Sequence, residues 1–217
     1  MLGEYSIASL IIMVAVISFL GFMLENTWLV LTKGFFDNRN MTFPFLLGYG
    51  LLVVGMYMIV GTPEKLCILG AHVSYRTAEQ KYLIYFALSF LIVTIGEIIL
   101  GHFVEKVFGF EYWNYTRLPL HITKYTSIPT SIGFALIITA FMGKCFAPIM
   151  TVINNISEHT MNAAAVVLAV VMTSDFIFSF AKMYKNHSLN VIWKKQVSEI
   201  GVIAMLSEKK DHIKFNR

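Results

Sequence analysis

Long apolar stretches separated by short polar segments dominate the chain. A helix that crosses the hydrocarbon core of a bilayer needs roughly 20 mainly apolar residues. Five stretches suit a spanning helix, and they run over Tyr5–Leu31, Phe43–Gly61, Tyr82–Phe108, Ile128–Met150 and Met161–Tyr184. The pattern therefore predicts an all-α fold, a polytopic transmembrane bundle of about five spans.

The two ends of the chain differ in character. Residues 1–184 are predicted to form the transmembrane domain, and residues 185–217 a basic cytoplasmic tail. The apolar stretch Val197–Leu206 in this tail is too short to span and is expected to be interfacial or soluble. Residues Met1–Glu4 lack the positive region that opens a signal peptide, and the apolar run behind them is too long for one, so we interpret it as the first span.

Composition supports a membrane location. Hydrophobic residues make up 57% of the 217 positions and charged residues 14%, against about 45–50% and about 25% in soluble domains. The net charge of +4 would suit nucleic-acid binding. The basic residues lie in loops and in the tail, however, where the positive-inside rule explains them better. We expect the lipid bilayer as a partner and no nucleic acid.

Positive charges also predict an orientation. With five spans, four of the 17 Lys and Arg residues fall on one side, namely Lys65, Arg76, Lys81 and Lys144, and the other 13 fall on the opposite side. Cytoplasmic loops carry the excess of Lys and Arg. The chain is thus expected in the cell membrane with its N-terminus outside and its C-terminus in the cytoplasm. A missed span would reverse the orientation of everything before it.

Three acidic residues lie inside predicted spans: Glu25, Glu97 and Asp175. Charged side chains in hydrocarbon are costly and usually face a bundle interior or a water-filled cavity. All three lie in odd-numbered spans, at mid-depth or nearer the predicted cytoplasmic side. They are candidates for one polar cluster that binds a substrate or an ion. The alternative is that each lies near a helix end and pairs with a loop Arg or reaches the interface.

Four polar or aromatic loop residues join this candidate set: Asn38, Arg39, Trp113 and Asn114. Aromatic residues at a membrane interface normally act as anchors. The Asn and Arg side chains are less well explained in that way. They have the donors needed to pair with the three carboxylates or to bind an anionic headgroup.

The sequence shows no signature of catalysis or of a metal or cofactor site. It contains no His-Glu-x-x-His, no Cys pair at ligand spacing, no P-loop and no nucleophile elbow. The two cysteines, Cys67 and Cys145, exclude a four-cysteine metal site. We expect no catalytic residue, no metal, no cofactor and no enzymatic activity, and any ATP hydrolysis would need a separate chain.

Two segments are similar enough to predict an internal repeat. Glu25–Phe36 and Glu97–Phe108 both open with Glu and close with Phe, and each is followed by a loop containing Asn. Each loop leads to a Pro with a Gly four residues later, at Pro44 and at Pro129. If the repeat is real, two helix pairs are related by an axis along the membrane normal. Chance similarity between apolar segments is the alternative.

Several short motifs resemble a known bacterial family, the putative ABC-transporter type IV permeases, CmpB-like. The resemblance covers roughly Ser18 to Ser179, and its motifs are Phe19-Leu20-Gly21 with Glu25 and Trp28, Asn38-Arg39, Pro44 with Gly48-Tyr49-Gly50, Glu97, Glu105-Lys106, Phe108-Gly109 to Trp113-Asn114-Tyr115, Ser131 to Gly133, and Asp175 with Ser179. The family usually has Gly at position 40, Asp at 114 and Trp at 132, where this chain has Asn, Asn and Ile.

The resemblance implies a transport component, an ABC-type permease-like subunit of unknown substrate. It further implies a separate ATPase subunit that docks on the loops around Asn38 and Trp113. Five spans are few for a complete pathway, so a homo-oligomer or a partner permease is expected. Two alternatives stay open: a scaffold or regulatory membrane subunit, and a membrane-embedded enzyme that uses a buried carboxyl group on a lipid.

Overall fold

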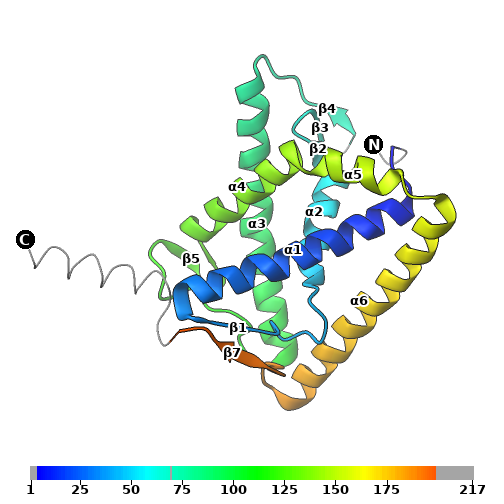
Figure 1. Ribbon diagram of the computed structural model, residues 1–217. Coiled ribbons are helices and arrows are strands. Elements are labelled where there is room, and N and C mark those ends of the chain that lie inside the picture. The colour runs from blue at the N-terminus through cyan, green and yellow to red at the C-terminus, as the bar shows by residue number, and fades with distance from the viewer. Residues whose placement is uncertain (1–3, 69, 199–217) are drawn as a thin grey trace, which may run out of the picture.

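The computed structural model describes residues 4–68 and 70–198, and most of them are helical (Figure 1). The helices are α1 (Ile7–Lys33), α2 (Leu47–Val60), α3 (Ala78–Phe108), α4 (Ile128–Lys144), α5 (Phe146–Asn154) and α6 (Glu158–Asn186). Short strands lie between and after them: β1 (Phe35–Asp37), β2 (Gly61–Thr62), β3 (Lys65–Ile68), β4 (Ala71–His72), β5 (His121–Thr123), β6 (Thr126–Ser127) and β7 (Lys194–Gln196). They pair antiparallel as β1–β7, β2–β3–β4 and β5–β6.

Within the described residues, three helices are long and apolar enough to cross a membrane, namely α1, α3 and α6. The bent pair α4–α5 would make a fourth candidate. Helix α2 has 14 residues, so its length is about 21 Å, less than a hydrocarbon core of about 30 Å. The prediction of five spans is therefore not confirmed. Residues 43–46, expected inside the second span, form an irregular, bent segment before α2 instead.

The expected fourth span, Ile128–Met150, is bent by 48° between α4 and α5. Pro148 accounts for the break, because proline has no N–H to donate to the carbonyl of Lys144 and its ring clashes with that carbonyl. On either side the helical bonds are intact: the Cys145 N–H donates to the Phe141 carbonyl (2.8 Å), and the Ile149 N–H donates to the Cys145 carbonyl (3.0 Å).

Helices α1, α3 and α6 all run downward in Figure 1, so their first residues mark an upper end of the molecule and their last residues a lower end. At the upper end, Lys65 pairs with Glu4 and Lys81 pairs with Glu64. At the lower end, α1, α3 and α6 each finish on a residue in the left-handed conformation, at Gly34, Gly109 and His187. A basic residue lies in the last turn of each, Lys33, Lys106 and Lys185, where it stabilises the helix dipole. The lower end is thus the more basic one.

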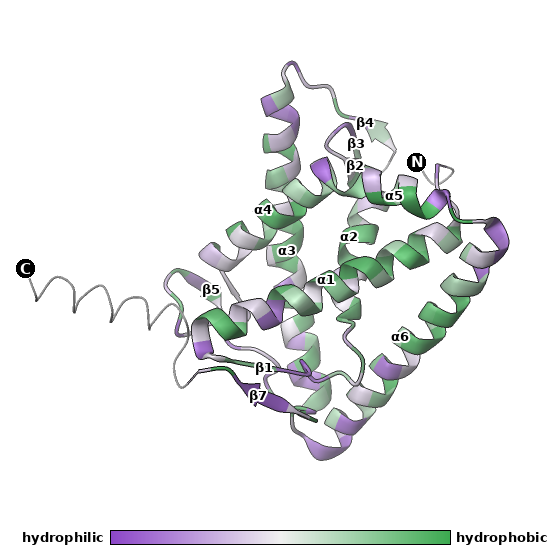
Figure 2. Ribbon diagram, in the orientation of Figure 1, coloured by the Kyte–Doolittle hydropathy of each residue, from purple (hydrophilic) through white to green (hydrophobic). Residues whose placement is uncertain are grey.

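Helix α1 lies near the centre of the bundle and contacts α2, α5 and α6, while α3 packs mainly on α4. Met13, Tyr85, Phe146 and Met150 are fully buried between these helices. Large apolar side chains on the outer faces of α3 and α6 are exposed, among them Leu83, Ile99, Phe103, Val166 and Phe178. Figure 2 shows these helices as predominantly hydrophobic. Exposed apolar helices of this kind suit contact with lipid.

The described part of the predicted tail packs back on the bundle. Strand β7 pairs with β1 in the register Phe35 to Gln196 and Asp37 to Lys194. His187 Nδ1 also lies 3.0 Å from the carbonyl oxygen of Phe108 at the end of α3. Most of the predicted interfacial stretch Val197–Leu206 lies outside the described residues.

Candidate functional site

The segment after β1 folds into a tight turn at the lower end. The Met41 N–H donates to the Asn38 carbonyl at 2.9 Å, and the two residues between them are left-handed, Arg39 with φ 45° and Asn40 with φ 67°. Two positive φ values mark a type I′ turn, which Asn tolerates well. For Arg39 the conformation is strained by about 1–3 kcal/mol, and it directs the guanidinium back toward α1.

Arg39 reaches Glu25, one of the three predicted carboxylates. The Arg39 Nε donates to Glu25 Oε2 at 2.6 Å, and Nη2 pairs with the same oxygen. The Tyr49 hydroxyl of α2 donates to the other oxygen, Oε1, at 2.8 Å. Burial alone would lower the pKa of Arg39, but Glu25 and Asp37 raise it above its ordinary value. The Arg39 guanidinium therefore stays charged, and about a quarter of each side chain of the pair is exposed (24% and 28%).

Asp175 on α6 holds the next part of the same segment. Its Oδ1 accepts from the Thr42 N–H at 3.0 Å, and its Oδ2 accepts from the Phe43 N–H at 2.9 Å. The Ser179 hydroxyl, one helical turn later, donates to Oδ1 at 3.2 Å. Asp175 is only 6% exposed. This carboxylate therefore ties residues 42–43, in the segment that precedes α2, to α6.

Asn38 connects this segment to the chain after α6. Its Nδ2 donates to the carbonyls of Met41 (2.9 Å) and Asn190 (2.8 Å), and its Oδ1 accepts from the Ile192 N–H (3.0 Å). Asn190 in turn donates to the Asn40 carbonyl at 3.2 Å. All hydrogen-bonding atoms of the Asn38 amide group are thus used, within the turn at residues 38–41 and between this turn and residues 190–192 after α6.

Glu97 on α3 has different surroundings from Glu25 and Asp175. The hydroxyl of Thr126, in β6 just before α4, lies close to its carboxylate. Its Oε2 is buried and has no hydrogen-bond partner among the described residues. Tyr115, in the segment before β5, interacts electrostatically with both Glu97 and Glu25. The three predicted carboxylates thus share the lower half of the bundle but not one set of partners.

The two remaining predicted residues stabilise the segment between α3 and α4. Trp113 Nε1 donates to the Tyr125 carbonyl at 2.8 Å. Asn114 Oδ1 accepts from the Thr116 N–H at 2.8 Å, and its Nδ2 donates to Glu111 at 2.6 Å. Both contacts shape the loop from within, and neither reaches Glu25, Glu97 or Asp175.

The contact between Glu25 and Tyr49 is the first acid–tyrosine contact of the chain. A second one, which the sequence prediction missed, lies at Glu105 near the end of α3. The Tyr125 hydroxyl donates to Glu105 Oε2, and Lys124 Nζ lies 2.5 Å from Oε1. The Tyr125 ring covers Gly101, where an added Cβ would lie 2.3 Å from the ring.

The first acid–tyrosine contact, at Glu25, has the same plan. A Cβ at Gly21 would lie 2.6 Å from the Tyr49 ring, and Glu25 follows Gly21 by four residues, as Glu105 follows Gly101. The predicted repeat, which matched Glu25 with Glu97, is not confirmed, and these contacts match Glu25 with Glu105 instead. The recurring Gly-x-x-x-Glu pattern was the signal that could have found the second contact.

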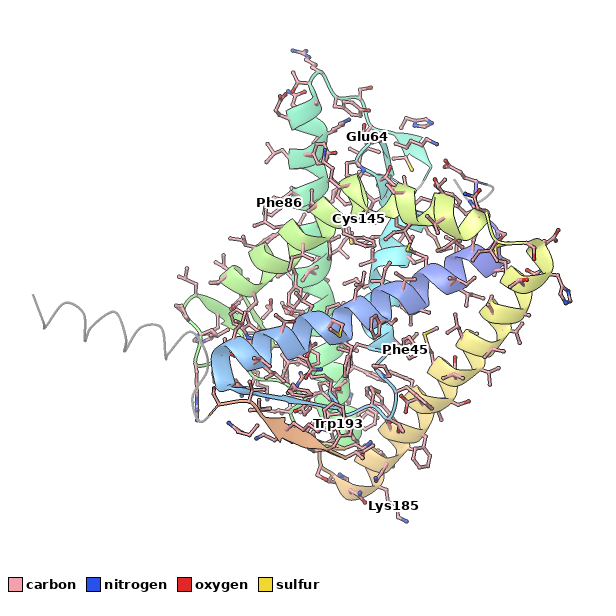
Figure 3. All side chains as sticks on the ribbon, viewed as in Figure 1. Phe45, Glu64, Phe86, Cys145, Lys185 and Trp193 are labelled. Carbon is pink, nitrogen blue, oxygen red and sulfur yellow. The ribbon has the colours of Figure 1, made fainter. Side chains whose placement is uncertain are left out.

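A groove of about 500 Å³ opens beside the first contact, between α1, the segment 36–44 and Trp193. Its walls are mostly apolar and include Phe22, Val30 and Phe43. Figure 3 shows Trp193 at the lower end, below α1. The groove therefore suits an apolar chain at the membrane interface. In the described part of the chain, no group of three or more His, Cys, Asp or Glu side chains is placed to hold a metal ion.

Comparison with known proteins gives one match. The model of the family described as "Putative ABC-transporter type IV" matches residues 12–180, which include most of α1, all of α2 to α5, most of α6 and all seven candidate residues. No curated protein and no solved structure matches the chain.

Proposed function

This chain belongs to the "Putative ABC-transporter type IV" family, and we propose that it is a permease-like subunit of an ABC-type transport system in the cell membrane. Membership supports a role related to transport. The permease role, the cell membrane and the partner chains are our proposal. The substrate is left open.

The observation that carries the proposal is the way one loop is tied to two candidate spans. Residues 37–43 are held to α1 by Arg39 and Glu25 and to α6 by Asp175. An ATPase subunit that moved this loop would therefore move both helices together. Such coupling between a docking surface and spanning helices is what an ATP-driven membrane subunit requires.

The same geometry suggests the orientation and the partners. The basic residues Lys33, Lys106 and Lys185 end three helices at the lower end, and the positive-inside rule then assigns that end to the cytoplasm. Three to four candidate spans are few for a complete pathway. We therefore propose a homo-oligomer or a partner permease in the membrane, and a separate ATPase chain bound at the lower end.

Purification from native membranes tests the proposal. We expect a nucleotide-binding chain to co-purify with the wild-type protein in mild detergent, and the complex to couple ATP hydrolysis to flux in vesicles. Arg39→Ala should reduce coupling, because it frees the loop from α1. Lys124→Ala, which removes the equivalent cation of the second contact, is the matched control and should retain coupling. A purified complex that sustains flux without any nucleotide-binding chain would contradict the ABC assignment.

A scaffold or regulatory subunit is the second candidate, and a specific observation favours it. Both oxygens of Asp175 and all hydrogen-bonding atoms of the Asn38 amide group are bound within the chain itself. Under this alternative, replacing either residue lowers stability in proportion to the lost bonds. Flux per folded complex then stays unchanged, which a transport assay normalised to folded protein measures directly.

A further inference from the structure

The three intramembrane carboxylates differ in what compensates their charge. Glu25 has the Arg39 guanidinium and the Tyr49 hydroxyl, and Asp175 has two backbone N–H groups and a serine hydroxyl. Glu97 has no cation within ion-pair distance among the described residues, and its Oε2 is buried without a partner. A buried carboxylate without a cation or donors is costly in a medium of low dielectric.

The groups around Glu97 come from its own helix, from β6 and from the loop before β5. Thr94 lies three residues earlier on the same helix, and its Oγ1 is also buried and unpartnered. Thr126 contacts the carboxylate, and its hydroxyl lies 3.0 Å from that of Ser131 in α4. Tyr115 faces it from the loop, and burial, followed by Glu97 and Glu25, raises the pKa of that phenol. All these neighbours are neutral at pH 7, so none of them balances a negative charge.

From this geometry we propose that Glu97 is a proton-binding site inside the helical bundle. A hydronium ion from the solvent transfers one proton: its O–H bond breaks, an O–H bond forms at a carboxylate oxygen, a water molecule is left, and the carboxylate becomes a neutral carboxylic acid. The acid gains a donor as well as an acceptor, which suits a site that offers the hydroxyls of Thr94 and Thr126. The depth also fits, because Glu97 lies eleven residues before the end of α3 at Phe108, about 16 Å from the lower end.

A proton suits the site better than a metal cation does. Sodium and divalent ions take several oxygen ligands, whereas the site offers a single carboxylate and the Thr126 and Ser131 hydroxyls already lie at bonding distance from each other. The proposal concerns binding alone and does not depend on the transport role above. A failure of either one therefore leaves the other standing.

Labelling with dicyclohexylcarbodiimide, an apolar reagent that adds to protonated carboxyl groups, tests the site. The full chain in detergent would be treated at a series of pH values and mapped by mass spectrometry. We expect modification at Glu97 and not at Glu25 or Asp175, because the oxygens of those two carboxylates are already bound, by Arg39 and Tyr49 or by backbone N–H groups. On the alkaline side of its titration, the labelling rate at Glu97 should fall about tenfold per pH unit, as the protonated fraction does.

Two variants control for folding. Glu97→Gln should lose the label and keep the wild-type thermal midpoint, because an amide resembles the neutral acid in shape and charge. Glu97→Asp should keep the label in a folded chain. The matched variant Glu25→Gln should lower the midpoint, since it removes the partner of Arg39. The proposal is overturned if the folded wild type is not labelled at Glu97 between pH 5 and 8, or if sodium, but not potassium, suppresses the labelling.

Discussion

The two acid–tyrosine contacts use the same kinds of residue in different surroundings. At the first, Tyr49 covers Gly21 and bonds Glu25, which pairs with Arg39; at the second, Tyr125 covers Gly101 and bonds Glu105, which pairs with Lys124. The cation of the first contact stands on a strained turn that α6 also holds. The cation of the second stands in an exposed loop beside Glu111.

This difference shows that position, more than residue type, decides what an ion pair does. Exposed pairs contribute little because water and salt screen them. Pairs shielded from water matter when one partner is removed, since the remaining charge is left uncompensated. We therefore expect the first contact to stabilise the helical bundle, and the second to stabilise only the loop between α3 and α4. The following variants separate these roles, beginning with the largest expected effect.

Arg39→Ala should lower the free energy of unfolding by about 2–3 kcal/mol, because it leaves Glu25 without its cation in a largely buried position. Relief of the left-handed strain at position 39 offsets little of this loss, because alanine is strained there too. Thermal unfolding in detergent, followed by circular dichroism, measures the change. Lys124→Ala is the control at the exposed contact. If both variants shift the midpoint equally, the two contacts do not differ as proposed.

Gly101→Ala and Gly21→Ala should each destabilise the fold by about 1–3 kcal/mol through overpacking against a tyrosine ring. The added Cβ atoms would lie 2.3 Å from Tyr125 and 2.6 Å from Tyr49. Gly96→Ala on the same helix as Gly101 is the control, because nothing lies within 4 Å of its Cβ position. That variant should be neutral or stabilising. A harmless Gly101→Ala would show that the tyrosine ring moves aside readily.

Tyr49→Phe should cost about 1–2 kcal/mol, because it removes a hydrogen bond to a carboxylate inside the bundle. Tyr125→Phe should have a smaller effect, since Lys124 also binds Glu105 and the Glu105 side chain is more exposed than that of Glu25 (37% against 28%). The two single variants and the double variant, compared by thermal midpoint, give the difference directly. An equal loss in both would mean that burial of the ring, and not of the carboxylate, sets the value.

The sequence was informative about the positions of the helices and of the basic residues, and less informative about individual hydrogen bonds. Apolar length indicated where the long helices lie. Lys33, Lys106 and Lys185, which were predicted to share one side, lie in the last turns of α1, α3 and α6, and the side of the membrane stays a prediction. The sequence also named Arg39 as a partner for a carboxylate. It could not show that Asp175 binds the backbone N–H groups of residues 42 and 43. Almost every residue has a backbone N–H, so the pattern of side chains does not indicate which of them a carboxylate binds.

Two local features were readable but were not used. Pro148 lies where the expected fourth span continues, and proline inside a helix breaks it. The Gly-x-x-x-Glu spacing occurs at both Gly21 and Gly101 and would have matched Glu25 with Glu105. The match with Glu97 followed the aromatic residue that ends each segment, and such residues are common in apolar helices.

The smallest expected effect is an acid response of the second contact. The Glu111 carboxylate accepts from Asn114 (2.6 Å) and Lys124 (2.9 Å), and these two hydrogen bonds, in that order, lower its pKa from the ordinary 4.5. A carboxyl group with a lowered folded-state pKa binds more protons when unfolded, so its contribution is present above pH 4.5 and disappears as the pH falls through the folded value. Glu111→Gln should therefore flatten the fall in thermal midpoint below about pH 4.5 and change little at pH 7. An unchanged acid profile would place the response at other carboxylates, with Glu64, whose pKa Lys81 and Tyr82 lower, as the next group to replace.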